Sequence, residues 1–277
     1  MLRLTVCSAL AVLVAAAVSA PAVTTPAAGT RGRTMQPPGS HAGPPYRFTT
    51  ELMGQFPLIP LKDQAMLTRT EHGYLFRTGQ QDSHLVVTLV DGRLRFVDTG
   101  TKRFKKLSPH CHRKSVRVGV AAKCGVPADV TVRRPLLIEV WPRLGNDYTD
   151  TSSLPATFAV TVLSDEGHDV AHLGAGPDFF NGHLGRDVVF GGAGNDWIRP
   201  GHGNDLVHAG PGNDDIVAMP GKDTLHGGPG RDQLWGGDGS DRIWGDGGAD
   251  YALCGPGRDR TNADGNDRVA QSCESVD

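Results

Sequence analysis

The chain has 277 residues, including 37 glycines, and a formal charge of −2 at pH 7. The charge is divided unevenly, with 20 basic and 10 acidic residues in 1–163 and 8 basic and 20 acidic residues in 164–277. The basic half does not resemble a nucleic-acid-binding module, so no nucleic-acid partner is expected, and the acidic half needs cations to offset its charge.

Residues 1–22 predict a secretory signal peptide, because Arg3 precedes an Ala/Val/Leu core and small residues lead to a cleavage site after Ala22. The protein is therefore expected to be secreted and extracellular. The apolar stretch is short and rich in alanine, so stable membrane insertion is not expected. Residues 23–45, rich in Pro, Ala, Gly, Thr and Ser, predict a flexible linker.

Residues 46–163 predict a small β-rich N-terminal domain. The strongest signal is a hairpin, in which Asp-Gly separates the β-prone runs His84–Val90 and Arg93–Asp98, because Asp-Gly favours tight primed turns. Further strands are expected at Gly73–Arg77, Val116–Val120, Leu136–Trp141 and Thr157–Leu163. Helical periodicity is not sustained over three turns anywhere, so the fold class is all-β.

Residues 164–262 divide into eleven consecutive nine-residue units without slippage. Position four is glycine and position six is aspartate in every unit, and position eight is apolar in ten of the eleven. A shortened twelfth unit follows, with Gly265, Asp267 and Val269 in the corresponding places. A disordered Gly/Asp linker would not keep three positions in phase over 99 residues, so the pattern predicts a regular repeat structure.

The consensus, G-G-x-G-x-D-x-U-x with U apolar, resembles the RTX-type (hemolysin-type) calcium-binding nonapeptide repeat. Segments beside the repeats, such as Leu144–Thr149 and Asp267–Glu274, are similar to those of exported calcium-binding repeat proteins of actinobacteria. The resemblance implies a parallel β-roll, a right-handed β-solenoid, over residues 164–277.

The spacing itself explains how such units could assemble. A glycine-rich hexamer can turn sharply, and in the three-residue strand that follows, position eight faces inward while positions seven and nine face outward. If successive units lie on opposite sheets, units two apart stack at roughly 4.8 Å and the aspartates form two rows. The first row is Asp169, Asp187, Asp205, Asp223, Asp241 and Asp259. The second row is Asp178, Asp196, Asp214, Asp232, Asp250 and Asp267.

Carboxylates stacked at that spacing repel each other unless a cation lies between them. Ca²⁺ fits best, because it accepts six to eight hard oxygen ligands, whereas Mg²⁺ demands tight octahedral geometry and keeps its waters. The resemblance implies that each ion lies between two turns on one edge, with carbonyls of early turn positions completing the shell. The expected metal ligands are the aspartates of both rows together with Gly191, Ala193, Gly194, Gly227, Pro229, Gly230, Gly236 and Asp238.

Two segments depart from the regular pattern. Met219 stands at position two, where its bulk disfavours positive φ, so the sites that touch the turn at 218–226 are expected to be weak or empty. Residues 145–147 read Gly-Asn-Asp and look like an early, degenerate repeat displaced by an insertion, so the roll could begin near Pro142.

Four cysteines remain after removal of the signal peptide, and an even number in an exported chain favours disulfides. Of the three possible pairings, Cys111 with Cys124 and Cys254 with Cys273 is the most economical. The second bond would cap the last coil of the solenoid, which lacks a neighbour on one side.

His172, Phe190, His208, His226 and Trp244 are spaced by 18 residues and should form one outward column. Two interpretations stay open for this column: a transition-metal site at the histidines, or an exposed polar and aromatic ladder.

No enzyme signature is evident, since the chain has neither the zinc motif His-Glu-x-x-His nor the Gly-x-Ser-x-Gly elbow. We therefore expect a non-enzymatic calcium-binding protein with a structural or interaction role, whose roll folds when Ca²⁺ binds. Two alternatives remain: a small secreted hydrolase or epimerase with its active site in 46–163, or a cell-surface adhesion module. The basic run at 102–106 could contact a cell-wall or surface polymer or the acidic roll of a neighbour, or it could be a solvated loop. The oligomeric state stays open.

Overall fold

The computed structural model describes residues 61–262, 265–270 and 273–275. The predicted signal peptide, the predicted linker and residues 46–60 lie outside this part of the chain. Every regular element that the structure describes is a β-strand. In the described ranges there is no helix long and apolar enough to cross a membrane.

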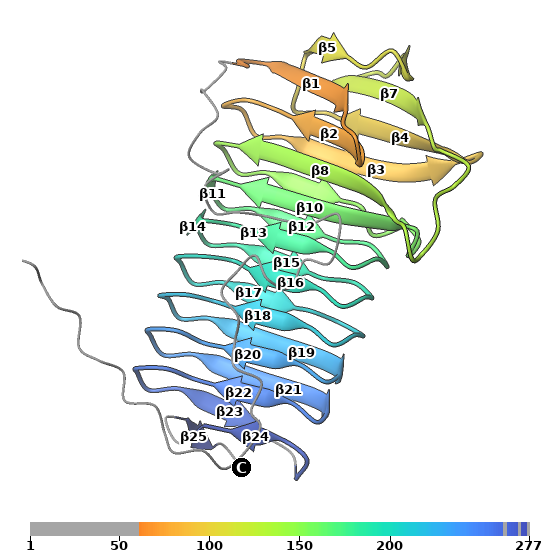
Figure 1. Ribbon diagram of the computed structural model, residues 1–277. Helices are drawn as coiled ribbons and strands as arrows, with labels where there is room; N and C mark the ends of the chain where they lie inside the picture. The colour runs from red at the N-terminus through yellow and green to blue at the C-terminus, as the bar shows by residue number, and fades with distance from the viewer. Residues whose placement is uncertain (1–60, 263–264, 271–272, 276–277) are drawn as a thin grey trace, which may run out of the picture. The chain divides into compact units, whose positions relative to one another are not determined.

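Two long sheets, here named sheet A and sheet B, contain almost all of the strands (Figure 1). In hydrogen-bonded order, sheet A consists of β24 (Arg268–Val269), β22 (Tyr251–Leu253), β20 (Gln233–Trp235), β18 (Asp215–Val217), β16 (Trp197–Arg199), β13 (Phe179–Asn181), β10 (Phe158–Ser164), β8 (Leu136–Arg143), β2 (Gly73–Arg77), β1 (Gln64–Arg69) and β5 (Arg103–Leu107). Sheet B consists of β25 (Glu274–Ser275), β23 (Arg260–Asn262), β21 (Arg242–Gly248), β19 (Thr224–Gly230), β17 (Leu206–His208), β15 (Val188–Phe190), β12 (Val170–His172), β9 (Tyr148–Asp150), β3 (His84–Val90), β4 (Arg93–Asp98), β7 (Val120–Gly125) and β6 (Cys111–Lys114). A small pair is formed by β11 (Glu166–Gly167) and β14 (Leu184–Gly185).

Successive repeats alternate between the two sheets, so that two units make one coil. Within the eleven regular repeats, each strand pairs in parallel with the strand 18 residues away, as in the register Phe180–Ile198 of β13 and β16, which continues to Ile216 of β18. In sheet B, Val189 of β15 pairs with Val207 of β17 in the same way. The predicted all-β class and the parallel β-roll are confirmed (Figure 1).

A narrow apolar core runs between the sheets. The side chains at position eight, such as Ile198, Val207 and Ile216, are completely buried, as the alternation along each strand predicts. Position one contributes as well, since Ala209 and Ala218 are also completely buried. This second inward position explains why several units replace the first glycine by a small or apolar residue.

The predicted strands of the N-terminal part are largely confirmed. The hairpin consists of β3 and β4 in antiparallel register, and Asp91 and Gly92 adopt φ values of 50° and 65° in the tight turn between them. The strand expected at Val116–Val120 is wrong. This alternating stretch is the loop of another hairpin, β6–β7, in which Cys111 lies opposite Cys124 and the two form a disulfide, leaving Val118 exposed.

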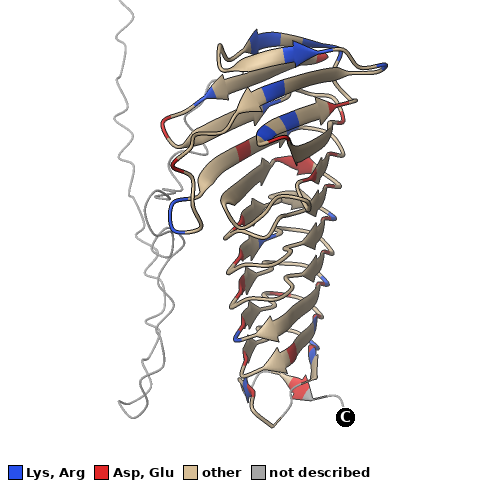
Figure 2. Ribbon diagram, turned by 90° about the vertical axis from the view of Figure 1, so that its right-hand side faces the viewer, with Lys and Arg blue, Asp and Glu red and all other residues tan. Residues whose placement is uncertain are grey.

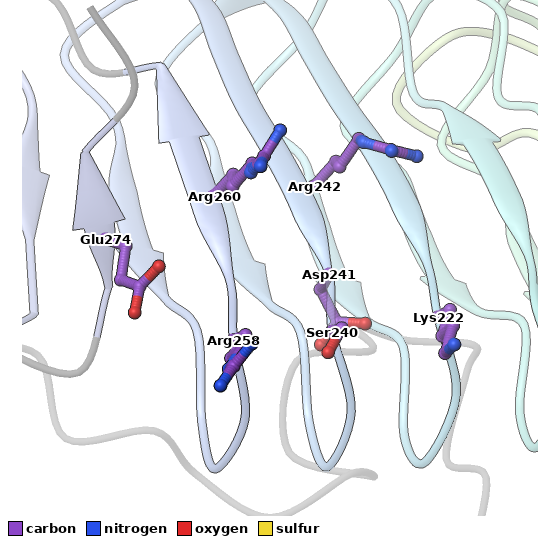
Figure 3. A pocket seen from close by; sticks show the side chains of 7 residues that line it. All are labelled: Lys222, Ser240, Asp241, Arg242, Arg258, Arg260 and Glu274. Atoms are coloured by element: carbon purple, nitrogen blue, oxygen red, sulfur yellow. The ribbon is translucent and has the colours of Figure 1, made fainter.

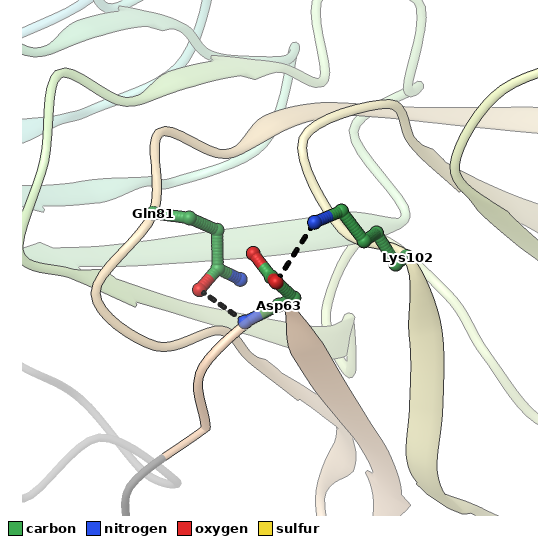
Figure 4. A network of polar contacts seen from close by, with 3 residues as sticks. All are labelled: Asp63, Gln81 and Lys102. Atoms are coloured by element: carbon green, nitrogen blue, oxygen red, sulfur yellow. Dashed lines mark hydrogen bonds and ion pairs between the residues drawn. The ribbon is translucent and has the colours of Figure 1, made fainter.

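Basic residues concentrate on the N-terminal strands, whereas acidic residues recur along the edges of the roll (Figure 2). The basic run at 102–106 is mostly strand β5, which forms the edge of sheet A, rather than a loop. Lys102 forms an exposed ion pair with Asp63 at 2.9 Å, and the Asp63 amide donates to the Gln81 side chain (Figure 4). Lysines on an edge strand discourage pairing with another chain, so this run caps the stack.

Both sheets continue through the predicted domain boundary at 163–164. In sheet A, β10 pairs with β8 on one side and with β13 on the other, and in sheet B, β12 pairs with β9 and with β15. The division of the chain at this point stays a sequence-based prediction. At the other end, the predicted Cys254–Cys273 disulfide is present and ties the segment before β25 to the last coils.

Candidate metal centre

The turns stack so closely that position four accepts only glycine. A Cβ atom added to Gly203 would lie 1.4 Å from the carbonyl oxygen of Gly185 in the preceding coil, and one added to Gly239 would lie 1.6 Å from that of Gly221. The contact is with backbone, which cannot move aside as a flexible side chain can. Backbone carbonyls of successive coils are thereby brought into line along each edge of the roll.

The aspartates at position six form two continuous ladders. In each ladder one carboxylate oxygen, Oδ1, accepts a hydrogen bond from the backbone amide of the aspartate one coil earlier, as Asp223 does from Asp205 at 2.8 Å and Asp214 does from Asp196 at 2.7 Å. All the aspartates from 169 to 259 at this position are buried. The two predicted rows are therefore present, although their role as ligands stays a prediction.

The other oxygen, Oδ2, is buried and has no hydrogen-bond partner in the described part of the chain at most positions of the two rows. These positions are Asp187, Asp196, Asp205, Asp214, Asp223, Asp232, Asp241 and Asp259. Oδ2 points towards position one of its own turn, since a Cβ built on Gly236 would lie 2.6 Å from Oδ2 of Asp241. A buried anionic oxygen without a partner is costly, so the turns have the donor set of a cation site.

The electrostatics of the turns agree with this interpretation. Burial, and after it the carboxylates of Asp169 and Asp205, raises the pKa of Asp187 to about 8, although the Asp169 amide acts in the opposite direction. Burial similarly raises the pKa of Asp223 to about 7 and that of Asp205 to about 6. Without a cation, these groups gain a proton at a pH where aspartate is normally ionised.

The two rows begin differently. Oδ2 of Asp178, at the start of the second row, accepts the backbone amide of Gly174 at 2.8 Å, so a protein donor already satisfies it. The first row begins earlier than predicted, because the amide of Asp147 donates to Oδ1 of Asp169 at 2.8 Å and Oδ2 of Asp147 is buried without a hydrogen-bond partner among the described residues. Asp147 is missing from the predicted ligand set.

The sequence did contain a signal for Asp147. The degenerate repeat at 145–147 is confirmed, because β9 pairs with β12 in the register of the roll. The separation of 22 residues between Asp147 and Asp169, four more than the regular period, hides this aspartate from a search with fixed spacing.

The carbonyl groups expected as ligands lie on the same edges and already take part in the stacking. The amides of Gly210, Gly212 and Gly221 donate to the carbonyls of Gly227, Pro229 and Asp238 at 3.0, 3.0 and 2.8 Å. Each carbonyl oxygen has a second lone pair for a cation. The other expected positions, Gly191, Ala193, Gly194, Gly230 and Gly236, belong to the same turns, and Gly194 donates to the carbonyl of Pro211 at 2.9 Å.

Met219 does not prevent its turn from forming. It adopts a φ of 86°, in the left-handed region that its side chain disfavours, and its carbonyl packs against Gly237 of the next coil as a glycine carbonyl does elsewhere. His183 and Asp246, also at position two, have φ values of 72° and 66°. The bulky residue is therefore accommodated with backbone strain, and the occupancy of the adjoining sites stays untested.

Comparison with known proteins identifies the repeat. The RTX calcium-binding nonapeptide repeat matches in four copies, at residues 163–198, 182–216, 201–221 and 217–252. Residues 163–252 are RTX calcium-binding repeats. Repeats of this family bind Ca²⁺ and are typically non-catalytic, and the proteins that carry them are typically extracellular. No curated protein and no solved structure matches the chain.

The RTX turns of this protein fit calcium by their chemistry. Among the described residues, no three side chains of His, Cys, Asp or Glu converge as a metal-binding group, so a cation between two stacked aspartates needs backbone carbonyls as further ligands. Hard oxygen donors of both kinds, in a flexible shell, are what Ca²⁺ takes. Bound Ca²⁺ would supply the positive charge that the unpartnered Oδ2 atoms lack.

The outward column is a continuous ladder of rings on sheet B. His172, Phe190, His208, His226 and Trp244 stack with centroid separations of 4.6, 5.3, 4.6 and 4.6 Å. The ladder continues from His172 to Tyr148 and then to His84, at 5.7 and 4.4 Å. The predicted ladder is thus confirmed and is longer than expected, although its five predicted members are half-buried rather than exposed. The described residues contain no third ligand for a transition metal at its histidines.

Proposed function

We propose that this chain is an exported calcium-binding protein with a structural or interaction role, whose RTX roll folds when Ca²⁺ binds along the two rows of aspartates. The observation that carries this proposal is the series of buried Oδ2 atoms that have no hydrogen-bond partner among the described residues, which recur at most positions of the two rows. The twelve aspartates, from Asp169 to Asp267, act as ligands together with carbonyls of their turns, and Asp147 extends the first row.

Coupling to folding follows from the charge and the thin core. Residues 164–277 carry a net charge of −12, and the buried aspartates repel one another when no cation is bound. The core contains only one or two apolar side chains per unit, such as Ala209 and Ile216 in residues 209–217, and ordering so many glycines has a high entropic cost. Ca²⁺ binds extracellular modules at about 10⁻⁴–10⁻³ M, so the roll orders after export through the signal peptide 1–22.

Circular dichroism and tryptophan fluorescence of the full chain test this proposal directly. Trp197, Trp235 and Trp244 lie on strands of the roll and report its order. In EGTA the strand signal should fall and the tryptophan emission should shift to longer wavelength, and millimolar Ca²⁺ should restore both. Equal concentrations of Mg²⁺ are the control. Identical spectra in EGTA and in Ca²⁺ would refute the proposal.

We also propose that the protein is not an enzyme. The paired carboxylates lie in the RTX turns, where their geometry serves a cation rather than a substrate. The rival interpretation, a hydrolase or epimerase in residues 46–163, predicts turnover when the full chain in Ca²⁺ is screened against ester, peptide and glycoside substrates. Turnover that survives removal of Ca²⁺ would favour the enzyme.

A further inference from the structure

We propose that the C-terminal coils of the roll form a binding site for tetrahedral oxyanions, sulfate or phosphate, in addition to the calcium sites. A cleft of about 600 Å³ opens between the edge of the roll and the outer face of sheet B (Figure 3). Four cationic side chains from three consecutive coils line it: Lys222, Arg242, Arg258 and Arg260. Ser240 adds a hydroxyl group between them.

The concentration of positive charge at this place is unusual for the roll. Residues 164–277 contain eight lysines and arginines in all, and four of them line this one cleft. Two carboxylates also line it, Asp241 and Glu274. Asp241 is buried, and its Oδ1 is occupied by the amide of Asp223, so it belongs to the calcium row rather than to the surface. The exposed part of the cleft is therefore net positive.

The cations are brought close to each other by the stacking of the coils. Arg242 and Arg260 are register partners on the parallel strands β21 and β23, so their side chains lie about 5 Å apart where they leave the sheet. Lys222 and Arg258 occupy position five of the same edge, two coils apart, with Ser240 between them (Figure 3). Like charges on neighbouring strands destabilise a sheet.

In the part of the chain that the structure describes, none of the four cations forms an ion pair within 4.0 Å. Glu274 is the register partner of Arg260, yet its side chain does not reach the guanidinium. An oxyanion placed among these groups would relieve their repulsion, and guanidinium groups suit sulfate and phosphate because they donate two parallel hydrogen bonds.

The site exists only when the coils are stacked, since its cations come from residues 222–260 and meet through the register of sheet B. Calcium and the oxyanion should therefore bind cooperatively, each increasing the affinity of the other. The sulfate or phosphate group could belong to a free ion or to an ester on an extended polymer, and two probes distinguish these sources.

The test is calorimetric titration of the full chain in Ca²⁺, with sodium sulfate as one probe and a heparin-derived hexasaccharide as the other. The cleft variant carries Arg242→Gln, Arg258→Gln and Arg260→Gln. The matched control carries Arg186→Gln and Arg231→Gln, which lie at position five in other coils, together with Arg199→Gln, so that the net charge changes equally. Circular dichroism in Ca²⁺ and in EGTA is recorded for each protein, so that a failure of calcium-dependent folding is distinguished from a failure of anion binding. If the cleft variant does not fold, the single variant Arg260→Gln replaces it.

The wild type and the control should bind at least about tenfold more tightly than the cleft variant, as expected for charge-assisted hydrogen bonds. Binding of sulfate and hexasaccharide with equal affinity identifies a site for a single ion, and binding of the hexasaccharide alone identifies a polymer surface. Either pattern supports the proposal. It is overturned if the wild type binds neither probe, or if the cleft variant and the control lose affinity equally.

Discussion

Asp214 and Asp215 are neighbours in the same repeat, yet replacing each by asparagine should affect calcium binding very differently. Asp214 is buried, its Oδ1 accepts the Asp196 amide at 2.7 Å, and its Oδ2 is left without a hydrogen-bond partner among the described residues. Asp215 begins strand β18 with its side chain on the outer face, where it accepts a hydrogen bond from Gln233 at 2.7 Å. Asparagine keeps an acceptor oxygen in both places, so the two variants differ only in which charge is removed.

The size of the effect follows from the position of Asp214 in its ladder. It is bonded to Asp196 on one side and, through its own amide, to Asp232 at 2.9 Å on the other, so its carboxylate adjoins two candidate calcium sites. A tenfold loss of affinity at each site corresponds to ~1.4 kcal/mol, or ~3 kcal/mol for the pair. The calcium concentration at the midpoint of folding should therefore increase at least about tenfold for Asp214→Asn.

The assay is a calcium titration followed by tryptophan emission and circular dichroism. Asp215→Asn should leave the midpoint within about twofold of the wild type, because it removes only an outward charge. In EGTA, Asp214→Asn should not destabilise the protein, since it removes an uncompensated buried charge. Equal midpoints for the two variants would show that the buried row does not bind calcium.

Three further results are expected. Gly203→Ala should lower the free energy of unfolding in Ca²⁺ by roughly 3 kcal/mol, because the added Cβ would lie 1.4 Å from a backbone carbonyl oxygen. The control is Gly247→Ala, whose Cβ would have no atom within 4 Å. It should change the free energy of unfolding, measured by chemical denaturation, by less than about 0.5 kcal/mol. Met219→Gly should relieve the strain of a φ of 86° and stabilise the calcium-bound roll by roughly 1 kcal/mol, with a lower calcium midpoint; an unchanged or higher midpoint would contradict the strain. The pKa values of the row aspartates are raised from 3.8, to about 8 for Asp187 and about 6 for Asp205. In EGTA, the folded state therefore binds more protons than the unfolded state. The stability of the folded state in EGTA should be greatest at acid pH and should fall as the pH rises through these pKa values. In Ca²⁺ the strand content should instead increase with pH. A circular dichroism series from pH 4 to 9, in EGTA and in Ca²⁺, tests both directions.

The regular part of the fold could be predicted from the sequence because the same nine-residue pattern determines the turn, the aspartate row and the inward side chain of every unit. Glycine at position four, aspartate at position six and an apolar residue at position eight each have a physical reason that recurs in every coil, so errors do not accumulate along the chain. The rows of aspartates and the aromatic ladder followed from the same period of 18 residues.

The remaining features depend on contacts that no local pattern records. The insertion before Asp169 hides Asp147, because a search at fixed spacing cannot know where the extra residues are placed. Val116–Val120 has the alternation of a strand, but the disulfide between Cys111 and Cys124 fixes the hairpin so that this stretch becomes its loop. The basic run at β5 was interpreted as a solvated loop because its place at the edge of sheet A becomes evident only from the order of the strands.

Met219 shows that residue propensity alone does not determine the backbone conformation. Propensity alone says that methionine avoids positive φ, yet the neighbouring coils determine the turn so strongly that the residue adopts it. The cleft at Lys222 and Arg260 could not be predicted from the sequence either, since its cations come from three segments that meet only after the coils are stacked.

The central claim, that stacked aspartates of neighbouring coils share calcium ions, is tested most directly by a crystal structure grown in Ca²⁺ with the ions located by anomalous scattering. The account predicts two lines of ions along the edges of the roll, each in contact with Oδ2 of row aspartates in consecutive coils, such as Asp205 and Asp223. Ions found only at the outer surface, or carboxylates of one row turned away from each other in the presence of Ca²⁺, would contradict it.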